Sequence, residues 1–104
     1  AAYYGIDRVV AYAASKSGVE GMVKVLASEF SPQNVRINAI APGFIETDLT
    51  AHYSGDKRQQ LTTQISLRRL GQADEVAAVI RFLCSNDARY ITGHILAVDG
   101  GFSL

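Results

Sequence analysis

The feature that most constrains the fold is an alternation of two helical periodicities with two short apolar runs. Apolar residues recur at spacings of three, four and seven from about Tyr12 to Phe30, which predicts an amphipathic helix. A second helix, with carboxylates in its first turn, is predicted from about Ala73 to Ser85. Two strands are predicted over Val35–Ile40 and Ile95–Val98, each bounded by turn residues.

This order of elements predicts an α/β fold. Two strands separated by a helical crossover pair in parallel and form a layered sheet with helices. The predicted strand Ile95–Val98 is apolar on both faces, which suits the interior of a larger sheet. A sheet of two strands is only marginally stable alone. We therefore expect the chain to form the carboxyl-terminal part of a larger domain.

The stretch 44–72 is too long to be a plain connector. We expect a short helix near Gly55 to Gln64 inside a mobile loop. Ligands of open α/β sheets bind outside the carboxyl ends of the strands, and this stretch leaves such an end. Residues 44–72 are therefore a candidate substrate loop or lid, the alternative being an ordinary surface loop.

Composition excludes several classes of protein. Ten basic and ten acidic side chains give no net charge, so neither nucleic acid nor an anionic membrane surface is an expected partner. No apolar run approaches the length of a membrane span. Cys84 is the only cysteine and there are two histidines, so no metal site is expected. A reducing, cytoplasmic location is the default, and we expect Cys84 in the core.

Tyr12 and Lys16 stand four residues apart on the first predicted helix, so they share one face. A cation beside a phenol favours the phenolate form. A phenol so placed can give a proton to an oxyanion or take one from an alcohol, which suits carbonyl reduction and its reverse. Tyr53 and Lys57 have the same spacing, but without apolar periodicity, and we interpret that pair as a coincidence in the loop.

The sequence resembles the short-chain dehydrogenase/reductase family. The matching segments are residues 12–16 (YAASK), 35–43 (VRINAIAPG) and 90–101 (YITGHILAVDGG). Residues 42–50 and 69–71 are most similar to 3-oxoacyl-[acyl-carrier-protein] reductases within that family. The resemblance implies the C-terminal portion, residues 1–104, of one doubly wound, parallel-sheet, Rossmann-like domain whose N-terminal dinucleotide-binding half is absent.

The resemblance also implies roles by position. Tyr12 would donate a proton to the substrate carbonyl oxygen, and Lys16 would favour its phenolate and hydrogen-bond the nicotinamide ribose. The Pro42–Gly43 turn would line the nicotinamide pocket. The Ile45 backbone and the Thr47 hydroxyl would hold the carboxamide or a nearby phosphate. The implied cofactor is NADP(H) rather than NAD(H), and the implied assembly is a homo-oligomer, a tetramer.

Departures from the family pattern bear on activity and substrate. The Gly-rich phosphate loop and the substrate-orienting serine would lie before Ala1, so we expect residues 1–104 alone to be inactive. Carrier-protein reductases place basic residues beside the site, whereas the turn 31–34 has none. Arg36, Arg68 and Arg69 are the remaining basic candidates for meeting an acyl carrier protein.

Three functions stay open at this stage. The first is reduction of a 3-oxoacyl thioester, carried on acyl carrier protein or CoA, in fatty acid synthesis. The second keeps the enzyme class but changes the substrate to a sugar or another secondary alcohol. The third is a short, non-catalytic docking module. Asn38 and Arg36 are expected to be structural, and His52 and His94 to have surface or hydrogen-bonding roles.

Overall fold

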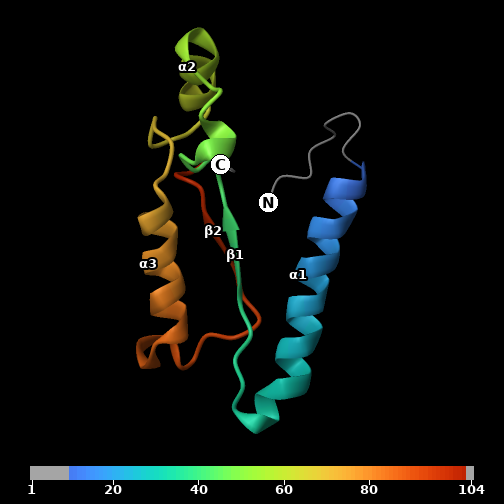
Figure 1. Cartoon of the computed structure of the whole chain (residues 1–104). Coiled ribbons are helices and arrows are strands. Elements are labelled where there is room, and N and C mark those ends of the chain that lie inside the picture. Colours follow the sequence, from blue (N-terminus) through green and yellow to red (C-terminus); the bar gives the residue numbers. More distant parts are fainter. Residues whose placement is uncertain (1–9, 103–104) are drawn as a thin grey trace.

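The computed structural model of the chain describes residues 10–102, where two parallel strands lie between helices (Figure 1). The strands pair with Ala39 opposite Ile95 and Pro42 opposite Val98. The α/β arrangement is therefore confirmed. In chain order the elements are α1 (Val10–Phe30), η1 (Ser31–Gln33), β1 (Ala39–Pro42), η2 (Asp48–Thr50), α2 (Gly55–Thr63), α3 (Ala73–Cys84), η3 (Asn86–Ala88) and β2 (Ile95–Val98).

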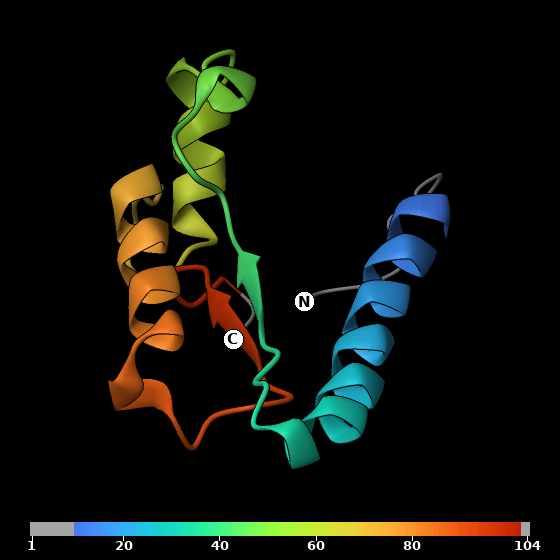
Figure 2. The same cartoon turned by 60° about the horizontal axis from the view of Figure 1, so that its bottom comes forward.

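The two long helices lie on opposite sides of the strand pair in both views (Figures 1 and 2). The C-terminal half of α1 is the part that packs, because Val23 and Ala27 are its buried residues. A Cβ placed on Gly93, in the turn before β2, would lie 3.4 Å from the Ala27 Cβ. Toward its N-terminus α1 diverges from the strands.

The apolar core of the described residues is small. Buried side chains outside α1 come from the end of the 44–72 stretch, from α3 and from η3: Ile65, Leu70, Leu83 and Ala88. Many large apolar side chains stay exposed along α1: Val10, Tyr12, Val19, Met22, Val25 and Phe30. An apolar helix face of this kind fits the expectation that the chain is part of a larger domain.

The predicted first strand lies too early in the sequence. It was expected over Val35–Ile40, but β1 runs over Ala39–Pro42. The preceding residues are extended but use other bonds: the Ile37 N–H donates to the Thr92 hydroxyl at 3.0 Å. Proline fits inside β1 because the N–H groups of Ala39 and Gly43 face β2 while position 42 faces away.

The expectation that Cys84 lies in the core is wrong, since Cys84 is exposed. Its neighbour Leu83 is the buried residue of α3. Successive helical residues point about 100° apart, so the apolar face that takes Leu83 turns Cys84 outward. The second helix otherwise has its predicted extent, ending at Cys84 instead of Ser85.

The 44–72 stretch contains η2 and the expected short helix, which is α2. In both views α2 lies beyond the carboxyl ends of the strands. The returning arm of the stretch is fastened to the turn after β2: the Leu67 N–H donates to the Gly100 carbonyl at 2.9 Å, and the Ser66 hydroxyl to the Gly101 carbonyl at 3.0 Å. Ile65 beside them is buried.

Candidate functional site

Tyr12 and Lys16 come together on the N-terminal half of α1. The Lys16 Nζ lies 5.4 Å from the centroid of the Tyr12 ring, within cation–π range. The Tyr12 side chain is 61% exposed, so its hydroxyl is open to a ligand. Tyr53, by contrast, precedes α2, so Tyr53 and Lys57 do not share one helix. The Tyr53 ring lies 4.2 Å from the His52 ring instead.

Pro42 and Gly43 place a close turn at the carboxyl end of β1. The Gly43 N–H donates to the Val98 carbonyl at 3.0 Å, which continues the ladder to β2. A Cβ on Gly43 would lie 2.6 Å from the Cβ of Asp99. The backbone at position 43 therefore passes too close to Asp99 to accommodate a side chain. This close approach fixes the direction in which the chain continues after Gly43.

The segment after Gly43 runs alongside Gly71 as an isolated parallel bridge centred on Ile45. The Gly71 N–H donates to the Phe44 carbonyl at 2.9 Å, and the Glu46 N–H donates to the Gly71 carbonyl at 2.8 Å. Backbone groups of neighbouring extended residues alternate between the two edges. The Ile45 N–H and carbonyl therefore point away from Gly71.

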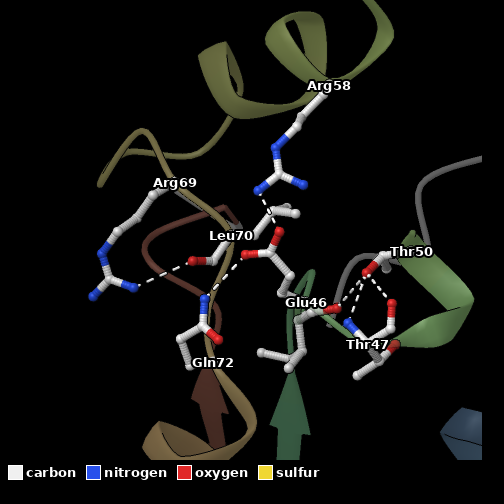
Figure 3. A network of polar contacts seen from close by, with 8 residues as sticks. Glu46, Thr47, Thr50, Arg58, Arg69, Leu70 and Gln72 are labelled. Carbon is white, nitrogen blue, oxygen red and sulfur yellow. Dashed lines mark hydrogen bonds and ion pairs between the residues drawn. The ribbon is translucent and has the colours of Figure 1, made fainter. Parts of the chain in front are cut away.

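Thr50 closes this segment from the other side (Figure 3). Its hydroxyl donates to the Ile45 carbonyl at 2.9 Å and accepts from the Thr47 N–H at 2.9 Å. Ile45 and Thr47, predicted separately as ligand-holding residues, are thus brought together by Thr50. Sequence reasoning missed this residue, although a threonine three positions after Thr47 has the spacing of a helix capping box.

Glu46 points to the opposite side, into a polar network (Figure 3). Its carboxylate accepts from Arg58 of α2 at 2.6 Å and from the Gln72 amide at 3.0 Å. Two hydrogen bonds hold the pKa of the Glu46 carboxyl below its ordinary value. The bond from Arg58 has the larger effect and the bond from Gln72 the smaller one. This network joins the end of β1, α2 and the start of α3, which no sequence spacing indicated.

A second ion pair fixes the start of α3. Arg69 donates to both carboxylate oxygens of Glu75, at 2.7 and 2.9 Å. The Gln72 N–H also donates to Glu75, at 3.0 Å. The Arg69 hydrogen bond, followed by the backbone one, lowers the pKa of Glu75 to about 2. Glu75 therefore caps α3 as a carboxylate.

The basic candidates for a carrier protein are all engaged within the chain. Arg36 donates to the carbonyls of Ile91 and Ser85, as expected for a structural residue. Arg68 donates to the Ile65 carbonyl at 2.9 Å. Arg69 has its carboxylate partner.

The remaining polar candidates take structural or surface positions. Asn38 donates to the Ile91 carbonyl and accepts from the His94 N–H, so its expected structural role is confirmed. The side chains of His52 and His94 are exposed. No group of three His, Cys, Asp or Glu side chains within residues 10–102 could hold a metal ion.

The two predicted halves of the site lie at the same end of the fold. The N-terminal half of α1 and the carboxyl end of β1 both face that end in the two views. No hydrogen bond or ion pair among residues 10–102 joins Tyr12 or Lys16 to Ile45 or Thr47. Within the described residues, Tyr12 thus lies with Lys16 and Ile45 with Thr47, but no hydrogen bond or ion pair joins these two pairs.

The residues at the end of β1 fit a carboxamide. A carboxamide has one acceptor and two donor hydrogens. The Ile45 N–H, aimed away from Gly71, has no acceptor within residues 10–102. The Ile45 carbonyl accepts one hydrogen bond, from the Thr50 hydroxyl, and has a second lone pair that can accept another. A hollow of about 120 Å³ lined by Ile45 and Gly71 is smaller than the roughly 300–1,000 Å³ of ligand pockets and does not by itself enclose a nicotinamide.

Known proteins resemble this chain in sequence. The family described as enoyl-(acyl carrier protein) reductase matches residues 1–103. A 3-oxoacyl-[acyl-carrier-protein] reductase of Aquifex aeolicus is 51% identical over 92 residues, covering 88% of this chain and 37% of the relative. The corresponding reductase of Escherichia coli is 47% identical over 90 residues, covering 86% and 37%. The chain thus spans somewhat more than a third of the length of these relatives.

Solved structures share the fold. A putative 2-deoxy-D-gluconate 3-dehydrogenase from Agrobacterium tumefaciens with bound NADP superposes with a TM-score of 0.89 at 39% identity, covering 97% of this chain and 42% of that one. A 4-hydroxyisoleucine dehydrogenase complexed with NADH gives 0.86 at 38% identity, covering 89% and 39%. None of the helices within residues 10–102 has both the length and the apolar character of a membrane crossing. The sequence and fold matches together establish that this chain belongs to the short-chain dehydrogenase/reductase family.

Proposed function

We propose that this chain supplies the proton-donating and nicotinamide-holding part of an NAD(P)H-dependent carbonyl reductase. The observation that carries the proposal is the pairing of Tyr12 with Lys16 on the N-terminal half of α1, which lies at the same end of the fold as the carboxyl end of β1. The segment that follows β1 carries the Ile45 N–H, which has no acceptor within residues 10–102. Two relatives compared above are named as 3-oxoacyl-[acyl-carrier-protein] reductases, so a 3-oxoacyl thioester is the proposed substrate.

The residues divide the chemistry between them. Nicotinamide, when bound, supplies the hydride. The Tyr12 hydroxyl gives its proton to the substrate carbonyl oxygen as negative charge develops there. The Lys16 ammonium, over the Tyr12 ring, stabilises the charge left on the phenol oxygen and hydrogen-bonds the ribose. Ile45 and Thr47 hold the carboxamide and so orient the ring.

The 44–72 stretch is proposed as the substrate loop. Its outgoing arm carries Ile45 and Thr47, and α2 lies beyond the strand ends where a substrate would enter. Arg58 fastens α2 to Glu46, so the loop contacts the segment that would hold the cofactor. Movement of α2 would then open or cover the site.

Preference for NADP(H) over NAD(H) stays a prediction, because one similar structure carries NADP and another NADH. A cytoplasmic homotetramer is likewise expected. The exposed apolar face of α1 supports association, since such a face needs cover from a second copy or from another part of the same domain. Sedimentation of the full-length protein would test the tetramer.

A second candidate is oxidation of a sugar or another secondary alcohol. Arg36, Arg68 and Arg69 each donate hydrogen bonds within the chain, and Arg69 also pairs with Glu75, which leaves fewer of their donors for an acidic carrier. The similar structure from A. tumefaciens is named as a putative 2-deoxy-D-gluconate 3-dehydrogenase. This candidate uses the same residues in the reverse direction.

One assay separates the two candidates. The full-length protein is given NADPH or NADH with acetoacetyl thioesters of CoA and of acyl carrier protein, and NADP or NAD with simple polyols. Thioester-dependent loss of reduced cofactor supports the reductase. Polyol-dependent formation of reduced cofactor, without thioester turnover, would replace it by the second candidate. No turnover with any pair would refute both.

A further inference from the structure

The backbone polar groups around Ile45 are almost fully committed. The Phe44 carbonyl and the Glu46 N–H are bonded to Gly71. The Ile45 carbonyl and the Thr47 N–H are both bonded to the Thr50 hydroxyl. The Ile45 N–H is left without an acceptor within residues 10–102. The network therefore presents this donor to the side that faces away from Gly71.

The hydroxyl of Thr50 has one hydrogen to donate. Two carbonyls lie within reach, that of Ile45 at 2.9 Å and that of Thr47 at 3.0 Å. The Thr47 carbonyl already accepts the Thr50 N–H at 3.0 Å, whereas the hydroxyl is the donor found for the Ile45 carbonyl. Donation to Ile45 satisfies more groups, so the hydroxyl links the carbonyl of Ile45 to the N–H of Thr47.

This link closes a small ring around Glu46. The peptide plane between Ile45 and Glu46 is then held at both ends, by Gly71 at its N–H and by Thr50 at its carbonyl. The next plane is held through the Thr47 N–H. Figure 3 shows Thr50, which belongs to η2, beside Thr47. Without the hydroxyl, the Ile45 carbonyl and the Thr47 N–H would lose their shared partner, and only the bond from the Glu46 N–H to Gly71 would hold this segment.

We propose that Thr50 is a positioning residue, which sets the backbone of residues 45–47 so that the Ile45 N–H and Thr47 meet the carboxamide of nicotinamide. The inference rests on the proposed function. Thr50 touches neither cofactor nor substrate in this account. Its hydroxyl acts through the two residues that do.

The test compares two kinds of probe on the full-length protein. NADPH and NADH contain nicotinamide, whereas 2′-phospho-ADP-ribose and ADP-ribose lack it but keep the adenine end. In Thr50→Val, one or two hydrogen bonds to the carboxamide lose their orientation. We therefore expect this variant to bind the reduced cofactor about tenfold more weakly than wild type. Binding of the matching probe without nicotinamide should stay within about twofold of wild type, since its contacts are elsewhere.

Two further variants keep the test clear. Thr50→Ser retains the hydroxyl and should recover most of the lost affinity, while Thr50→Ala should behave like Thr50→Val. Thr62→Val is the matched control, because the Thr62 hydroxyl also bonds a carbonyl three residues back, at 3.0 Å, but within α2. This control should bind both probes as wild type does.

The outcomes distinguish this inference from the proposed function. Equal weakening of both probes in Thr50→Val and Thr50→Ala would mean a general structural role and would overturn the positioning role. Unchanged binding of the reduced cofactor would overturn it as well, with the proposed function intact. If wild-type protein binds neither NADPH nor NADH, the proposed function itself fails and this inference fails with it.

Discussion

Replacing Gly43 by alanine tests whether the close turn after β1 is as tight as the structure shows. The added Cβ would lie 2.6 Å from the Asp99 Cβ and 2.7 Å from the Asp99 Cα. Non-bonded carbons prefer about 3.5–4.0 Å, so the two strand ends must separate by roughly 1 Å. Overpacking that moves backbone costs about 1–3 kcal/mol. The Gly43 N–H bond to Val98, at 3.0 Å, would be stretched by the same shift.

The measurement is urea unfolding of the full-length protein, with Gly71→Ala as the control. A Cβ on Gly71 would lie 2.8 Å from the Ile45 Cδ1, which is the end of a flexible side chain that can rotate away. The control should therefore lose less than about 1 kcal/mol. The reasoning is refuted if Gly43→Ala is as stable as Gly71→Ala or more stable, because backbone contact would then cost no more than side-chain contact.

Three further predictions concern catalysis, the loop and pH. In the full-length protein Tyr12→Phe should lower turnover by at least about a hundredfold while cofactor binding persists, because the proton donor is gone. Tyr53→Phe should keep turnover near wild type, and the reverse ranking would contradict the assignment. Glu46→Gln and Arg58→Met should each speed amide exchange in α2, since each breaks the same ion pair, and unchanged protection would argue against this fastening. Because the pKa of Glu75 is lowered from 4.5 to about 2, its stabilisation is present above about pH 4.5 and lost as the pH falls toward 2. Unfolding titrations over that range should show a steeper loss for wild type than for Glu75→Gln, and parallel curves would show that the ion pair adds nothing.

The parts of the fold that follow from local pattern could be predicted. The periodicities of α1 and α3, and the apolar run of β2, are properties of neighbouring residues, and their bounds agree closely with the structure. The position of β1 depends instead on distant partners. Residues 35–38 look like a strand, but the Ile37 N–H bonds to the Thr92 hydroxyl and the Ile37 carbonyl accepts the Gly93 N–H, outside the register of the β1–β2 ladder. Pattern alone does not show which extended residues pair.

The same division holds in the candidate site. Lys16 beside Tyr12 follows from helical geometry, so four-residue spacing was sufficient. The bonds of Thr50 require the chain to turn back at η2. The contact of Glu46 with Gln72 joins residues 26 positions apart. Apart from the capping-box spacing of Thr47 and Thr50, no motif in the sequence signals these contacts, because they come from tertiary folding.

The central claim is that α1 and the segment after β1 share one nicotinamide site. A crystal structure of the full-length protein with bound reduced cofactor measures this directly. We expect the carboxamide to lie within hydrogen-bond distance of the Ile45 backbone, with the Tyr12 hydroxyl facing the C4 edge of the ring and Lys16 at the ribose. A nicotinamide bound away from Ile45, or a Tyr12 hydroxyl turned away from the ring, would contradict it.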